Sequence, residues 1–64
     1  MNHQYEGYNI RVVEAAGLAA IIFPPGETAI MAGDTPRATR QEGLGVLLIR
    51  ARKAIDKDIK RRGG

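Results

Sequence analysis

The sequence contains no cysteine, no serine and no tryptophan, and its single histidine is His3. Nucleophilic catalysis by Ser/His/Asp or Cys/His groups therefore cannot be assembled within one chain. Structural zinc needs about four Cys or His ligands, which one histidine does not supply. Disulfide bonds are excluded too, so none reinforces the small core of a 64-residue chain. We expect no enzymatic activity, no cofactor, no metal site and no small-molecule substrate.

Long hydrophobic runs are also missing. The longest, Leu18–Phe23 and Val46–Ile49, are far shorter than the ~20 residues that span a membrane. Hydrophobic residues make up 44% of the chain and charged residues 27%, which is ordinary globular composition. We therefore expect a soluble, cytoplasmic protein with one small domain over residues 1–64, without a membrane partner. Its ends, 1–4 and 63–64, are expected to fray.

The amino-terminal half of the sequence has the features of strands. Apolar side chains occupy alternate positions at Tyr8, Ile10 and Val12, which is the period-2 pattern of a half-buried strand. A short run rich in Ile and Phe follows after a small turn, and Pro25-Gly26 then favours a chain reversal. The predicted strands cover about 5–14, 18–24 and 28–32.

The carboxy-terminal half predicts a helix. Thr39 and Glu42 have the spacing of a capping box, in which each side chain accepts a hydrogen bond from the other residue's backbone N–H. Apolar residues then recur every three or four positions: Leu44, Leu47, Leu48, Ala51, Ile55 and Ile59. We predict one amphipathic helix over about 39–62. The fold class is therefore α+β, a three-stranded antiparallel meander packed by one C-terminal helix.

The middle strand of this meander is apolar on both faces. Alternation places Ala20 and Ile22 on one face and Ala19, Ile21 and Phe23 on the other. One helix covers one face only, so the second face needs another cover, or else it keeps a few exposed apolar residues as many monomers do. The leading hypothesis is a small non-catalytic protein-interaction or structural module, a homodimer or protein partner joined through Ala19, Ile21 and Phe23.

Charge is divided unevenly between the two halves. Residues 1–34 carry one arginine against four acidic residues, while residues 35–64 carry nine basic residues against three acidic ones. Helical periodicity gathers several basic residues on the side opposite the apolar stripe, where they either form a solvated face or contact an acidic partner. The alternative function is therefore nucleic-acid binding by a basic helix row. Its candidate contacts are Arg11, Arg50, Lys53, Lys57, Lys60 and Arg61.

A three-stranded sheet can also enter the major groove of DNA, where Asn9 and Arg11 would lie on the exposed sheet face. The order of elements resembles that of small DNA readers with three strands and a helix, such as plant AP2 domains and the arm-binding domains of phage integrases. The resemblance rests on topology alone. It implies binding of duplex DNA through the sheet.

Overall fold

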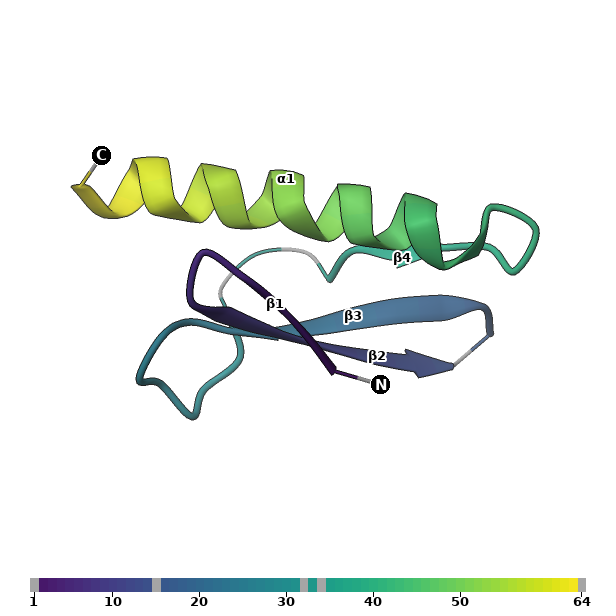
Figure 1. The fold of residues 1–64 in the computed structure, drawn as a ribbon, viewed down its shortest axis with the longest axis horizontal. Helices are drawn as coiled ribbons and strands as arrows, with labels where there is room; N and C mark the ends of the chain where they lie inside the picture. The colour runs from purple at the N-terminus through teal and green to yellow at the C-terminus, as the bar shows by residue number, and fades with distance from the viewer. Residues whose placement is uncertain (1, 15, 32, 34, 64) are drawn as a thin grey trace.

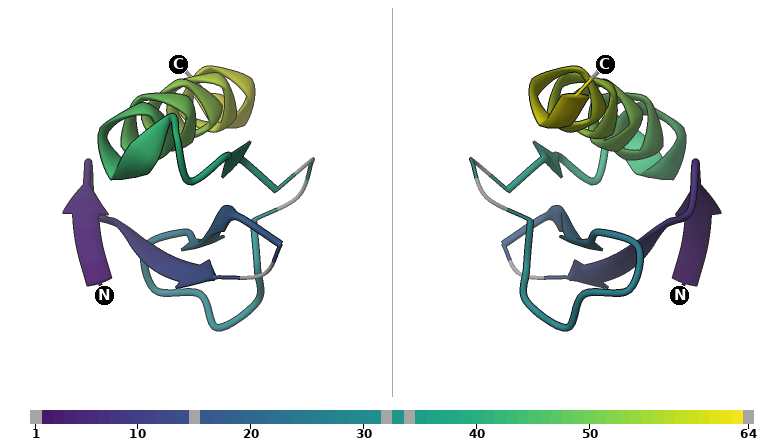
Figure 2. Two further views of the ribbon diagram at one scale, coloured as in Figure 1. Left: turned by 90° about the vertical axis from the view of Figure 1, so that its right-hand side faces the viewer. Right: turned by 90° about the vertical axis from the view of Figure 1, so that its left-hand side faces the viewer.

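The computed structural model describes residues 2–14, 16–31, 33 and 35–63. Its elements are β1 (Asn2–Tyr5), β2 (Tyr8–Glu14), β3 (Leu18–Phe23), β4 (Arg37–Ala38) and α1 (Gly43–Gly63). The strands form one antiparallel sheet in the order β1-β2-β3-β4, and α1 lies across one face of it (Figure 1). Among the described residues, no helix covers the opposite face (Figure 2). The α+β class, the antiparallel meander and the single C-terminal helix are confirmed.

The predicted first strand, 5–14, is in fact a hairpin of β1 and β2. Tyr5 pairs with Tyr8 across a two-residue turn in which Glu6 (φ 52°) and Gly7 (φ 81°) both have positive φ. Two such residues define a type I′ turn, whose twist matches that of the flanking strands. Glycine adopts this conformation readily but glutamate does not, so the sequence signal was weak. Asn2–Gln4, expected within a frayed end, is paired with β2.

The third strand does not lie at 28–32, because residues 28–31 form no strand. The chain turns at Pro24, whose carbonyl oxygen accepts a hydrogen bond from the Glu27 N–H at 3.1 Å, and then continues as an exposed loop. It returns along β3, where the Met31 N–H donates to the Ile22 carbonyl oxygen at 2.7 Å. The strand that completes this edge is β4, which is only two residues long and so has no pattern to detect. Residue 32 lies outside the described residues.

The core lies between α1 and the inner face of the sheet. On the sheet side, alternate residues of β2 and β3 are buried: Tyr8, Ile10, Ala20 and Ile22. On the helix side, Leu47, Ala51 and Ile55 follow one another at four-residue spacing and are completely buried. The stripe then drifts off the sheet, since Ile59 is 36% exposed and the buried residue of the last turns is Asp58. The alternate side chains of the strands and the side chains that recur every 3.6 residues along the helix thus pack against each other in one layer.

The capping box forms, although it precedes the helix. The Glu42 N–H donates to Thr39 Oγ1 at 3.1 Å, and the Thr39 N–H donates to Glu42 Oε1 at 2.9 Å. Gly43 has φ 85°, outside the helical range, so the box closes a turn over residues 39–43 and α1 continues from there rather than from residue 39.

Two glycines allow a matched test of this backbone. At Gly17 the φ is +116° and an added Cβ would lie 3.0 Å from the Ala38 carbonyl oxygen, whereas Gly45 lies in α1 with open space around it. We expect Gly17→Ala to lower the free energy of unfolding by about 1 to 3 kcal/mol. Gly45→Ala should raise it by about 0.5 to 1 kcal/mol. Urea unfolding followed by circular dichroism measures both, and a neutral Gly17→Ala would contradict the geometry of the β2–β3 turn.

Candidate functional site

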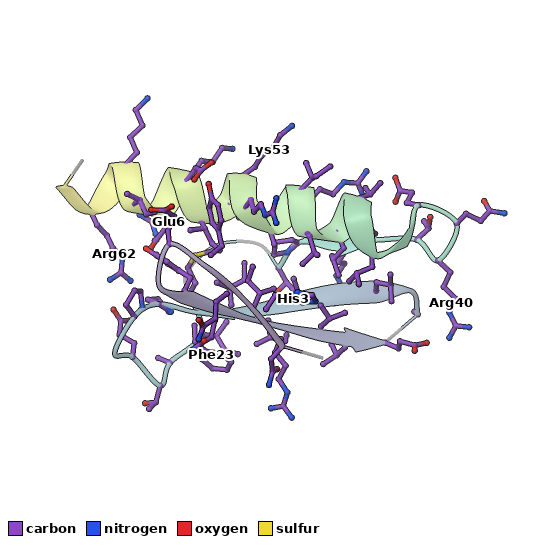
Figure 3. The ribbon with its side chains drawn as sticks, in the orientation of Figure 1. His3, Glu6, Phe23, Arg40, Lys53 and Arg62 are labelled. Carbon is purple, nitrogen blue, oxygen red and sulfur yellow. The ribbon has the colours of Figure 1, made fainter. Side chains whose placement is uncertain are left out.

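The face of the sheet that points away from α1 is not covered by α1. We call it the outer face, and it is defined by the residues that alternate with the buried ones. Cross-strand pairing arranges them in rows: Gln4 lies beside Asn9 and Asn9 beside Phe23, while Asn2 lies beside Arg11 and Arg11 beside Ile21. Figure 3 shows Phe23 on the side of the sheet away from α1. The N-terminal strand therefore adds two amide side chains to this face.

A shallow hollow of about 530 Å³ lies on the outer face. Its lining contains one cation, three amide side chains and one aromatic ring, and no acidic residue: Asn2, His3, Gln4, Asn9, Ile10, Arg11 and Phe23. The Gln4 Nε2 group donates to Asn9 Oδ1 at 3.1 Å, which fixes the two amides relative to each other. Amide and guanidinium groups donate and accept hydrogen bonds in fixed planar geometries. The hollow is thus equipped to bind a polar or anionic partner.

The residues proposed as a dimer surface share this face but differ in exposure. Ala19 is only 4% exposed, and Arg37 of β4 pairs with it. Ile21 and Phe23 are half-buried, so only part of each side chain is available to a partner. Their role in a homodimer stays a prediction.

The residues proposed as anion contacts fall on two separate surfaces. Arg11 belongs to the outer face, whereas the other five lie on α1, and Lys53 points away from the sheet (Figure 3). Four of these five line a groove of about 380 Å³ between α1 and the segment that leads into β4: Arg50, Lys53, Lys57 and Arg61. Lys60 is exposed and does not line the groove. One flat partner surface cannot contact both sets at once.

Two members of the helix row are already engaged within the chain. The Arg50 guanidinium forms a forked pair with Glu42, at 3.0 Å and 2.7 Å, and also donates to the Arg37 carbonyl oxygen at 2.8 Å. The hydrogen bonds from Arg50 and, next in size, from the Thr39 backbone N–H together lower the pKa of Glu42 to about 2, against the opposing effect of burial. Arg61 pairs with Asp58. Lys53, Lys57 and Lys60 form no ion pair with another residue in the described part of the chain.

A buried carboxylate that the sequence did not single out fixes the end of the helix. Asp58 is 2% exposed, accepts a hydrogen bond from the Tyr8 hydroxyl at 2.5 Å, and pairs with Arg61 and, at 2.7 Å, with Arg62. The Arg62 guanidinium also reaches Glu27 at 2.7 Å. The cluster therefore joins β2, the loop after β3 and the last turns of α1.

Hydrogen bonding decides the charge state of this cluster. The Tyr8 hydroxyl lowers the pKa of Asp58, the two arginines lower it further, and burial opposes them. The same hydrogen bond and burial raise the pKa of Tyr8. Both carboxylate oxygens are thus occupied, which is the arrangement of a structural tie and not of a free acid or base. The only sign of this contact in the sequence is the spacing of Tyr5 and Tyr8, three positions apart, and of Asp56 and Asp58, two positions apart. Tyr5 and Asp56 form a similar contact, in which the Tyr5 hydroxyl donates to Asp56 at 3.0 Å.

Within residues 2–14, 16–31, 33 and 35–63, no three His, Asp or Glu side chains come together in a way that could hold a metal ion. In that part of the chain, no helix combines the length and the apolar character that crossing a membrane requires.

Comparison with protein-family models, curated proteins and solved structures found no match. The function must therefore be inferred from the surfaces described above.

The Asp58 cluster predicts a specific acid sensitivity. Because the pKa of Asp58 is lowered from 3.8 in the folded state, its contribution to stability is complete above the unfolded-state pKa and is lost as the pH falls through the folded-state pKa. Asp58→Asn should lower the urea midpoint at pH 7 and weaken the further loss of stability below about pH 4. The matched control is Asp56→Asn, which removes a carboxylate that is exposed. Equal acid profiles for wild type and Asp58→Asn would contradict the assignment.

Proposed function

We propose that this protein is a non-catalytic module that binds duplex DNA through the outer face. The observation that supports the proposal is the composition of the hollow, in which Arg11 and the amides of Asn2, Gln4 and Asn9 lie together without an acidic neighbour. Acidic residues in such a hollow would repel phosphate groups. Their absence leaves a surface that suits a polyanion.

These side chains are also the ones that read base edges. Arginine binds the O6 and N7 atoms of guanine, and asparagine or glutamine binds the N6 and N7 atoms of adenine. The major groove is about 12 Å wide and admits β-strands. On the outer face Asn2 and Arg11 occupy one row, and Gln4 and Asn9 occupy the next. Neighbouring rows lie about 6.7 Å apart along the strands, so they can contact base pairs about two steps apart.

Duplex DNA suits this face better than RNA or single strands do. Proteins that bind single strands stack successive bases on several aromatic rings, and the lining of the hollow contains only Phe23. The major groove of A-form RNA is too narrow for side chains to read. B-form DNA is the remaining partner that matches amide and guanidinium groups on a sheet.

The second candidate is a homodimer through the same face, because Ile21 and Phe23 are half-buried there. A two-fold interface is self-complementary, so a residue near its centre meets its own copy. Arg11, which lies between Asn2 and Ile21, would then meet a second Arg11 with no acidic residue in the hollow to compensate it. Burial of unpaired like charges is costly. The outer face therefore suits DNA better than a second copy of itself.

The first test is fluorescence anisotropy of labelled duplexes at about 50 mM and about 200 mM salt, because phosphate contacts weaken as salt rises. A duplex preferred by the protein would first be selected from a randomised library. We expect Arg11→Gln to weaken binding of that duplex roughly 10-fold to 100-fold, the loss of one bidentate base contact, and to relax the preference at one position.

Lys60→Gln is the matched control, since it removes the same charge from an exposed position on α1. We expect it to change the affinity less than about twofold. The double variant Lys53→Gln with Lys57→Gln tests the basic helix row. If it weakens binding evenly across all sequences and Arg11→Gln does not weaken binding, the DNA-contacting surface lies on α1 and not on the outer face. Absence of binding at low salt, with a dimer that Ile21→Asp dissociates, would favour the second candidate.

A further inference from the structure

The sheet ends in an open edge at β1. This strand pairs with β2 on one side only, because the strand order is β1-β2-β3-β4. Both views in Figure 2 show β1 at the outer flank of the molecule, and none of the other described elements lies beyond it. An unpaired edge offers backbone N–H and C=O groups to another strand.

The hairpin register identifies the backbone groups that point outward. The two residues flanking a type I′ turn, Tyr5 and Tyr8, exchange backbone hydrogen bonds, and pairs alternate from there between hydrogen-bonded and non-hydrogen-bonded. His3 is therefore bonded to β2, whereas the N–H and C=O groups of Asn2 and Gln4 point away from it. The open edge carries four backbone groups in a row.

Nothing on this edge discourages pairing. Natural proteins protect open edges with lysine, proline, bulges or inward-pointing charges, and Asn2–Tyr5 contains none of these residues and pairs with β2 without a bulge. The strand also contains no aspartate, glutamate, lysine or arginine, so two copies do not repel each other there through such charges. A further observation concerns His3, whose buried Nε2 has no hydrogen-bond partner in the described chain.

We propose that β1 pairs antiparallel with β1 of a second copy, about a two-fold axis at His3. In this register Asn2 of one copy faces Gln4 of the other, and the four outward groups of each chain make four hydrogen bonds across the axis. The pairing also places the second His3 imidazole beside the first. The pairing joins the two sheets, so that their outer faces form one surface. The consequence of this joined surface for DNA binding rests on the proposed function.

The joined sheet sets a distance on the DNA. Three strand spacings, about 14 Å, separate the two β2 strands across the axis. Arg11 pairs with Asn2, one residue from the axis, so the two Arg11 residues are also offset by about 7 Å along the strands and lie about 16 Å apart. Base pairs stack about 3.4 Å apart, so this distance corresponds to about five base pairs. The preferred duplex should therefore be a short palindrome, with equivalent contacts about five base pairs apart. Each copy contributes half of the reading surface.

A substitution at Gln4 separates the backbone role of β1 from its side chain. Gln4→Pro removes the N–H that points to the open edge and leaves the bonds of His3 to β2 in place, a position at which proline is tolerated. Gln4→Ala removes the same side chain and keeps the N–H. Sedimentation velocity across a range of protein concentrations, with and without the selected duplex, measures the mass of each variant. Circular dichroism verifies that both are folded.

We expect wild type and Gln4→Ala to form dimers and Gln4→Pro to remain monomeric, with at least tenfold weaker binding to the palindromic duplex. A wild-type chain that stays monomeric at high concentration and on DNA overturns the proposal. So does a dimer that Gln4→Pro leaves intact and Ile21→Asp dissociates. A dimer lost only in Gln4→Pro, with no DNA binding in the wild type, supports the edge pairing and refutes the proposed function.

Discussion

A single helix packed on a four-stranded sheet covers one face of it, and the other features of this molecule follow from that constraint. The inner face obtains its cover from Leu47, Ala51 and Ile55, which are completely buried. In the part of the chain that the structure describes, the outer face has no such layer and is composed instead of amides, arginine and half-buried apolar side chains. A sheet whose second face meets water or a partner is expected to carry polar side chains there. The polar rows of β1 and β2 agree with this expectation, and the apolar run of β3 is the exception.

The fold was predictable to the extent that a pattern repeats. The alternation of Tyr8, Ile10 and Val12 and the helical stripe from Leu47 to Ile55 each extend over several periods, and the structure confirms the sheet and the helix that they predict. The turn at Glu6 was hidden because its first residue is not one that favours positive φ. The edge strand β4 could not be predicted, because two residues are too few to show a periodic pattern. Its pairing also depends on residues nearly twenty positions earlier in the chain.

The candidate site was less predictable than the fold. Asn9 and Arg11 could be placed on one face from alternation, but Asn2 and Gln4 join them only through the hairpin that the sequence did not reveal. The basic helix row was recognised by its period, although the sequence did not show that Arg50 and Arg61 are occupied by Glu42 and Asp58. Periodicity states which residues share a face. It does not show which of these residues already form ion pairs within the chain.

The contact between Tyr8 and Asp58 joins residues 50 positions apart, and this separation bears on the order of folding. The hairpins of β1 to β3 close over short stretches of chain, whereas docking of α1 must close nearly the whole chain and meets a larger entropic barrier. On this argument we expect the inner face of the sheet to be among the last surfaces to leave water. An interaction that forms only after the transition state acts chiefly on the rate of unfolding. The buried carboxylate is therefore expected to govern how long the folded chain persists more than how quickly it forms.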